Sequence, residues 1–120
     1  MKETLIIDRP LYTGKLLKQV DNNLIKILTG QRRVGKSYIL NYLYPEIRKK
    51  KQDANIIRIN LEDYAFAHIT DAQTLHNEIS SRLISGTKNY IFIDDVQEVK
   101  DFDKVLRSLI LDKKNDIYVT

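Results

Sequence analysis

The chain has 120 residues, a net charge of +4 and a pI of about 9.2, which suits one mildly basic domain with a moderate core. It contains no cysteine, which excludes disulfides and thiolate metal sites and fits a cytoplasmic protein. There is no run of about 18 apolar residues, and the apolar stretch of MKETLIIDRP is too short for a signal peptide, so we predict neither a membrane span nor a secretory leader.

The first half of the chain predicts a helix, a strand and a second helix. Pro10 suits the first position of a helix whose apolar stripe reaches Val20. After a polar turn, the apolar run Leu24–Thr29 predicts a buried strand. A second helix is expected from Lys36, and Pro45 should kink it or divide it in two.

A further strand and helix are predicted next. The segment Ala54–Leu61 has the apolar composition of a strand. Thr70 is expected to cap the following helix, with Gln73 completing a capping box. Apolar residues spaced by four give this helix one buried stripe, made of Leu75, Ile79 and Leu83. Ser85–Gly86 is the expected stop.

The last part of the chain predicts strand, helix and strand. Tyr90–Asp94 is an apolar strand that ends in an acid, and Asp101 is expected to cap a helix with a regular apolar stripe. Asp116–Thr120 predicts a fourth strand. Strands that alternate with amphipathic helices indicate a single α/β domain over residues 1–120, with a parallel sheet and helices on both faces. Such sheets bind ligands beyond the carboxyl ends of their strands.

A glycine-rich loop follows the first predicted strand, beyond its carboxyl end. The segment Gly30–Ser37 reads GQRRVGKS and matches G-x-x-x-x-G-K-[ST], between a strand and a helix. Glycines allow the backbone to wrap a phosphate, Lys36 would reach the β- and γ-phosphates, and the Ser37 hydroxyl would bind Mg²⁺. The predicted phosphate-binding residues are Gly30, Gln31, Arg32, Arg33, Val34, Gly35, Lys36 and Ser37.

Two acids at the end of the third predicted strand complete the expected site. Asp94, on a parallel neighbour of the loop's strand, would lie near Ser37 and help to hold Mg²⁺. Asp95 would be the catalytic residue that polarises the attacking water. The competing interpretation is a strand end capped by two solvated aspartates.

The segments LIKILTGQRRVGKSYIL and YIFIDDVQEVKDFDKVLRSL closely resemble the predicted AAA-type ATPases of bacteria and archaea. In that family the phosphate loop reads G-x-R-R-V-G-K-[ST], and the Walker B strand ends in Asp-Glu, an aliphatic residue and Gln. The resemblance covers nearly the whole chain. It implies a P-loop fold of the additional-strand type, with ATP and Mg²⁺ as cofactors.

Two departures from the family pattern carry further expectations. Asp95 stands where the family usually has glutamate, so we expect ATP binding with slow or absent hydrolysis. Family members continue past the position of Thr120 into a polar sensor stretch, a fifth strand and a nuclease-like domain that could contact DNA or protein. We therefore expect a truncated ATPase domain without the fifth core strand, which would leave an unpaired edge beside the loop's strand and favour self-association.

Alternatives remain open. The chain could be a nucleotide switch that does not hydrolyse ATP, or a basic DNA-binding module. Arg32 and Arg33 could contact phosphate or a subunit, or only aid solubility. For several other candidates we favour a structural role, as core residues, surface residues or solvent-exposed ends of helices and strands, over a functional one. They are Tyr12, Arg48–Lys51, Glu62–Asp63, His68 and His76.

Overall fold

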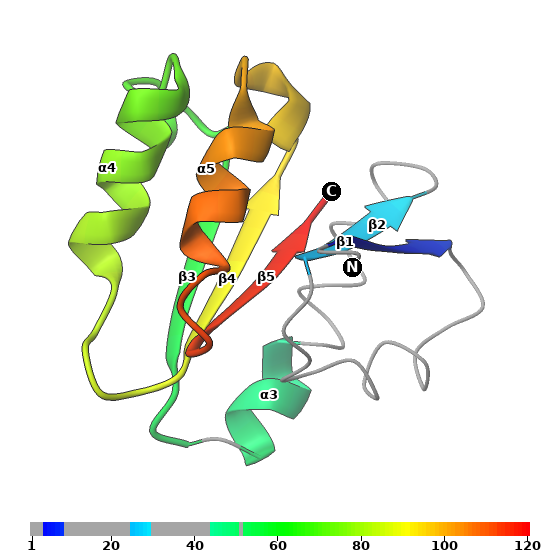
Figure 1. The fold of residues 1–120 in the computed structure, drawn as a ribbon, viewed down its shortest axis with the longest axis vertical. Helices are drawn as coiled ribbons and strands as arrows, with labels where there is room; N and C mark the ends of the chain where they lie inside the picture. The colour runs from blue at the N-terminus through cyan, green and yellow to red at the C-terminus, as the bar shows by residue number, and fades with distance from the viewer. Residues whose placement is uncertain (1–3, 9–24, 30–43, 51) are drawn as a thin grey trace.

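The computed structural model describes residues 4–8, 25–29, 44–50 and 52–120. These residues form a five-stranded parallel sheet with the strand order β1-β2-β5-β4-β3 (Figure 1). The strands are β1 (Thr4–Asp8), β2 (Ile25–Thr29), β3 (Asn55–Asn60), β4 (Asn89–Asp94) and β5 (Asn115–Val119). Because every pair is parallel, the carboxyl ends of the strands share one edge of the sheet.

Four of the strands begin and end within one residue of the predicted ranges. The order of these four confirms the predicted α/β fold of the additional-strand type, in which a strand lies between those that carry the two nucleotide motifs. One detail of the prediction is wrong. β4 is not a direct neighbour of β2, because β5 pairs with both of them.

The strand β1 is absent from the predicted elements. It pairs with β2 over its full length, from Thr4 opposite Ile25 to Asp8 opposite Thr29. The prediction of an unpaired edge at β2 is therefore wrong, and with it the reason given for self-association. β1 occupies the position that the resemblance assigns to the missing fifth core strand.

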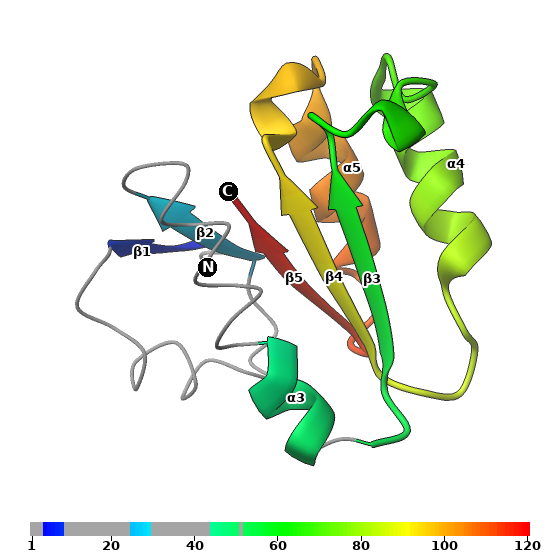
Figure 2. The same ribbon diagram turned by 180° about the vertical axis from the view of Figure 1, so that it is seen from behind.

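Helices cover both faces of the sheet, as predicted. α4 (Ala72–Arg82) and α5 (Phe102–Leu109) lie in front of β3 and β4 in Figure 1 and behind them in Figure 2. α3 (Tyr44–Lys50) lies on the opposite face, where the Tyr44 and Phe92 rings are 5.8 Å apart between centroids. No helix in the described part of the chain is long and apolar enough to cross a membrane.

The helix predictions before Tyr44 lie largely outside the described residues. These are the helix that begins at Pro10 and the start of the helix that begins at Lys36. Pro45 lies in the described part of α3, and the residues just before Tyr44 lie outside the described residues. The predicted kink or division of the helix at this proline therefore stays a prediction.

The predicted caps are corrected in detail. Asp71, and not Thr70, caps α4: its carboxylate accepts from the backbone N–H of Thr74, and the Thr74 hydroxyl reaches the Asp71 backbone N–H. The capping box thus begins one residue later than predicted, and Gln73 is not its partner. Asp101 does precede α5, but with φ of 61° and no hydrogen bond from its side chain to the helix.

The two faces of the sheet differ in chemistry because side chains alternate along each strand. The face toward α4 and α5, which we call the apolar face, is formed by branched aliphatic residues. They are Ile25, Ile57, Ile59, Ile91, Ile93, Ile117 and Val119. These residues pack against Leu75 and Ile79 of α4 and Val105, Leu106 and Leu109 of α5. This face supplies the core of the described residues.

The face toward α3, which we call the polar face, carries charged and aromatic side chains. Its residues include Lys26, Arg58, Phe92, Asp94, Asp116, Tyr118 and Thr120. Arg58, Phe92, Tyr118 and Lys26 occupy one row across four adjacent strands. The two rings are stacked with centroids 4.9 Å apart, and the Lys26 ammonium lies 5.1 Å from the Tyr118 ring centroid.

Candidate functional site

The carboxyl edge of the sheet brings together the ends of β2 and β4, the two strands that the predicted nucleotide motifs follow. Ile27, Val119 and Ile93 lie in one row across β2, β5 and β4. Asp94 follows this row by one residue, and Gly30 follows it by three in the sequence. Neighbouring strands are about 4.8 Å apart, so β2 and β4 are separated by roughly 10 Å. This span can hold a phosphate group and its metal ion between the two strand ends.

The loop itself lies outside the described residues. This applies to every predicted phosphate-binding residue from Gly30 to Ser37, including Arg32 and Arg33, and also to Tyr12. The structure does describe β2, which leads directly into the loop. The described part of the candidate site therefore consists of the ends of β3, β4 and β5.

Asp94 is the central residue of this part of the site. It is the last residue of β4, and its side chain has no exposed surface. Arg58 of β3 donates to its Oδ2 atom twice, from Nη2 at 2.5 Å and from Nε at 3.2 Å. The Thr120 hydroxyl donates to its Oδ1 atom at 3.3 Å. Both carboxylate oxygens thus have donors from neighbouring strands.

Asp95 begins the turn that follows β4. Its backbone has φ of 62°, a left-handed conformation that aspartate tolerates better than most residues. Its side chain is buried, and its backbone N–H donates to the Thr120 hydroxyl at 3.3 Å. The turn carries the chain from the strand into η3 (Val96–Glu98), which begins with the buried Val96.

Thr120 is a site residue that the sequence analysis does not assign. Its hydroxyl bridges Asp94 and Asp95, because it donates to the first side chain and accepts from the backbone of the second. Its backbone is held between β4 and η3, through its N–H to Ile93 and its carbonyl to Val96. The available signal was a polar residue immediately after an apolar strand.

Arg58 is the second unassigned residue. The signal for it was a lone charge within the otherwise uncharged segment ANIIRINL. Its partner could not be read from the sequence, because Arg58 and Asp94 are 36 residues apart in the chain. Only the pairing of β3 with β4 brings them together.

The other described candidates have surroundings of their own after β3 and on α4. Glu62 and Asp63 are exposed, and the Asp63 carboxylate caps η2 (Tyr64–Phe66) by accepting from Ala65. The His68 ring contacts Glu78 at 2.7 Å on the exposed side of α4. The other histidine, His76, lies 3.4 Å from the Ser80 hydroxyl.

The basic run is the last turn of a helix. Residues 48–50 are exposed at the end of α3, and Arg48 donates to the carbonyl of Ala54 at 2.9 Å. Cations in the last turn complement the helix dipole without any partner. This placement supports the interpretation as a solvated helix end.

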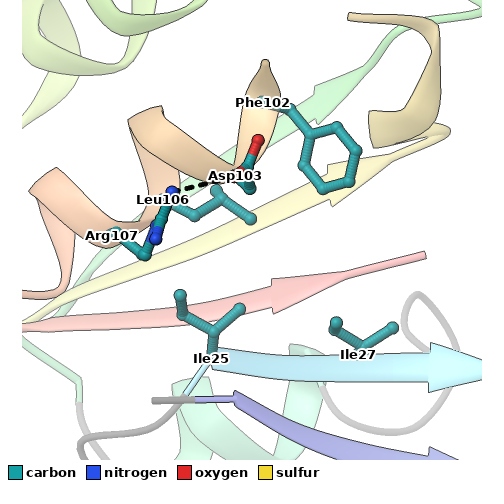
Figure 3. Close-up of a pocket in the computed structure, with 6 residues that line it drawn as sticks. All are labelled: Ile25, Ile27, Phe102, Asp103, Leu106 and Arg107. Carbon is teal, nitrogen blue, oxygen red and sulfur yellow. Dashed lines mark hydrogen bonds and ion pairs between the residues drawn. The ribbon is translucent and has the colours of Figure 1, made fainter. Parts of the chain in front are cut away.

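A pocket of about 250 Å³ lies on the apolar face, between β2 and α5 (Figure 3). It is lined by Ile25, Ile27, Phe102, Asp103, Leu106 and Arg107. Its two charged residues pair with each other at 2.9 Å. An apolar lining and an internally paired arginine do not suit a triphosphate. We therefore assign no nucleotide to this pocket.

The oxygen groups at the carboxyl edge fit a hard cation. Mg²⁺ prefers oxygen ligands and is commonly held by one or two carboxylates together with substrate phosphates. Asp94 supplies a carboxylate and Thr120 a hydroxyl, and a cationic guanidinium already contacts the carboxylate. The described residues contain no cluster of three acids or histidines, so a metal here would depend on ligands from the nucleotide and the loop.

Comparisons with known proteins agree with this arrangement. A family model described as an AAA domain matches residues 22–120. An uncharacterized protein of Haemophilus influenzae is 29% identical over 117 residues, which cover 96% of this chain and 29% of that protein. An uncharacterized protein of Methanocaldococcus jannaschii is 36% identical over 99 residues, which cover 82% of this chain and 21% of that protein. The chain thus spans less than a third of each relative. No solved structure matches it significantly.

Proposed function

This chain belongs to the AAA domain family, and we propose that it is an ATP–Mg²⁺ binding core with slow or absent hydrolysis. Family membership indicates nucleotide binding in general. The choice of ATP is supported by the resemblance of its loop and strand motifs to AAA-type ATPases and by the lack of a guanine-reading Asn-Lys-x-Asp motif. The absence of cysteine supports a cytoplasmic setting.

The buried carboxylate of Asp94 is the observation that carries this proposal. A charge with no exposed surface is retained at the end of β4, although burial of a carboxylate is costly. It stands at the edge where the phosphate loop begins, separated from β2 by the single strand β5. A metal ion held by Asp94 and bound phosphates would account for a carboxylate at this position.

In the proposed site each group has one role. Gly30 and Gly35 allow backbone N–H groups to surround the phosphates, and Lys36 neutralises the β- and γ-phosphates. Ser37 and Asp94 would hold Mg²⁺. When bound, Mg²⁺ supplies charge neutralisation at the phosphate oxygens. Asp95 orients the attacking water.

We propose slow hydrolysis because of Asp95. Aspartate is one methylene shorter than glutamate, and Asp95 is buried in a left-handed turn that restricts its reach. We expect Asp95→Glu to raise phosphate release by at least about tenfold, because general bases contribute about 10²–10⁴-fold when well placed. The same variant should be less stable, because glutamate tolerates a positive φ less well than aspartate.

The first experiment is calorimetric titration of the chain with Mg·ATP. Micromolar binding is expected, with loss of binding in Lys36→Ala and weaker, less Mg²⁺-dependent binding in Asp94→Asn. Matched controls are Lys104→Ala and Asp101→Asn, which change the same charges at exposed positions of α5 and its cap. Absence of binding to a folded chain would contradict the proposal.

A nucleotide-dependent switch without hydrolysis is the second candidate, and Asp95 is the residue that favours it. Phosphate release followed over hours separates it from a slow ATPase. Wild-type turnover near 10 per second, about the median for enzymes, would contradict both. Steeply salt-dependent DNA binding in the absence of nucleotide would instead support the DNA-binding module.

A further inference from the structure

The Arg58 guanidinium contacts the carboxylate that the proposed Mg²⁺ would also bind. It lies on β3 opposite Phe92, and its guanidinium reaches diagonally to Asp94, two positions further along β4. Both of its hydrogen bonds go to the same oxygen, Oδ2. Thr120 occupies the other oxygen. A metal ion that binds Asp94 must therefore approach a carboxylate oxygen that already accepts a hydrogen bond.

The charge of Asp94 explains why a cation is needed there. A carboxylate without exposed surface loses its hydration, and an unpaired buried charge destabilises a protein strongly. Arg58 compensates this charge through a charge-assisted contact of 2.5 Å. The ion pair thus compensates the charge of Asp94 within the sheet.

The guanidinium is also able to leave. The Arg58 side chain retains 20% of its surface in contact with solvent, and β3 is the last strand on its side of the described sheet. An arginine that loses Asp94 can therefore regain contact with water through its exposed part. By contrast, Asp94 cannot reach solvent without movement of the strands around it.

We infer that Arg58 is the counter-ion of the metal-free site, and that Mg²⁺ displaces it from Asp94 when nucleotide binds. This inference rests on the proposed function. Arg58 is then a positioning residue that opposes metal binding and sets the Mg²⁺ concentration at which ATP binds. Two cations compete for one carboxylate, so removal of the first strengthens the second.

The test is a Mg²⁺ titration at a fixed ATP concentration, with nucleotide binding as the readout. Arg58→Met removes the cation and keeps a long apolar side chain beside Asp94. We expect the Mg²⁺ midpoint to fall by about tenfold, because the metal no longer has to break an ion pair. Arg107→Met is the matched control, because it removes an arginine from an exposed ion pair on α5 and should leave the midpoint unchanged.

A second measurement uses the wild-type chain and does not depend on the folding of a variant. In the metal-free protein the Nε–Hε signal of Arg58 should be observed by nuclear magnetic resonance as protected from exchange with water. Addition of Mg·ADP should abolish that protection, whereas ADP with a chelator should not. Arg58→Lys, which keeps the charge but loses the fork of donors, should have a Mg²⁺ midpoint between those of wild type and Arg58→Met.

The outcomes separate this inference from the proposed function. If wild type does not bind Mg·ATP, the proposed function fails. If wild type binds but Arg58→Met has an unchanged or higher Mg²⁺ midpoint, only the inference is overturned, and Arg58 acts on phosphate or on structure. Retained protection of the Nε–Hε group in the Mg·ADP complex overturns it equally.

Discussion

Two buried ion pairs lie on the polar face, at opposite ends of one row of side chains. Lys26 pairs with Asp116 toward the amino ends of the strands, and these side chains are 0% and 1% exposed. Arg58 pairs with Asp94 at the carboxyl edge, and the arginine is 20% exposed. The first pair is enclosed, since Tyr118 also donates to Asp116 at 2.7 Å and packs beside Lys26. The second has one partner in contact with water.

This difference suggests different roles for chemically similar contacts. Breaking an enclosed pair leaves a buried charge without hydration, which destabilises the folded protein strongly. Such a pair therefore contributes to stability. A pair with one solvated partner can exchange that partner for another cation. We therefore assign a role in stability to the Lys26–Asp116 pair and a role in metal binding to the Arg58–Asp94 pair.

The largest effect is expected for Lys26→Met. This substitution leaves Asp116 charged and buried, with the Tyr118 hydroxyl as a described donor. The free energy of unfolding should fall by about 3–5 kcal/mol, measured by urea denaturation. If the free energy of unfolding falls by less than about 1 kcal/mol, water reaches the Lys26–Asp116 pair in solution. That result would contradict the distinction between the two ion pairs.

A double variant tests the cause of that loss. Lys26→Met combined with Asp116→Asn removes both charges and keeps an acceptor for Tyr118. We expect it to regain most of the stability lost in the single variant, because neutral replacements avoid an unpaired buried charge. A double variant as unstable as Lys26→Met would mean that packing of the lysine, and not its charge, is what matters.

A smaller effect is expected for Phe92→Leu, in the centre of the row. Leucine keeps the apolar character of this buried position but removes the stacking with Tyr118 and the contact with Tyr44. Unfolding should become easier by about 1–1.5 kcal/mol in thermal or urea denaturation. Mg²⁺ dependence of nucleotide binding should not change, because the Arg58–Asp94 contact does not pass through the ring. A shifted Mg²⁺ midpoint would show that the two ion pairs are coupled.

The pH dependence of a partly exposed acid, Glu78, provides a contrast with the pairs on the polar face. Hydrogen bonds from His68 and Arg82 lower the pKa of Glu78 below its usual value of 4.5. Stability from this group is therefore complete above about pH 4.5 and is lost as the pH falls through the lower folded pKa. Glu78→Gln should reduce the slope of unfolding free energy against pH in that acidic range, with a change of about 0–1 kcal/mol near neutral pH. Equal slopes in the two proteins would show that the contacts do not persist in solution.

The smallest effect is expected at the exposed pair between Asp103 and Arg107, one turn apart on α5. Both side chains are more than half exposed. Asp103→Asn should change the free energy of unfolding by less than about 0.5 kcal/mol, and added salt should reduce even that difference. A loss comparable with that of Lys26→Met would contradict the view that burial makes the polar-face pairs strong.

Most of the fold follows from local patterns. The strand at Tyr90–Asp94 and the stripe of α5 were predictable because buried strands and amphipathic helices have distinct apolar periods. β1 is missing from the prediction although Leu5, Ile6 and Ile7 are good strand formers, because a short edge strand next to Pro10 resembles a loop. The cap of α4 was misplaced because adjacent Thr70 and Asp71 both suit an N-cap.

The sequence predicts the candidate site only where motif spacing defines it. The phosphate loop and Asp94 are proposed from residue type and from their position after apolar strands. Thr120 and Arg58 could be noticed as polar residues within or after strands, but not assigned to Asp94. Their contacts depend on which strands are neighbours, and strand order is not encoded by any local period.

The sequence by itself determined the alternation of strands and helices and the position of two acids after one strand, and it predicts a phosphate loop. Only the tertiary structure decided which charges meet. Arg58 and Asp94 are separated by 36 residues, and Lys26 and Asp116 by 90. Parallel strands bring such distant residues onto neighbouring strands through crossovers, and burial then favours their pairing, because a charge withdrawn from water requires a partner.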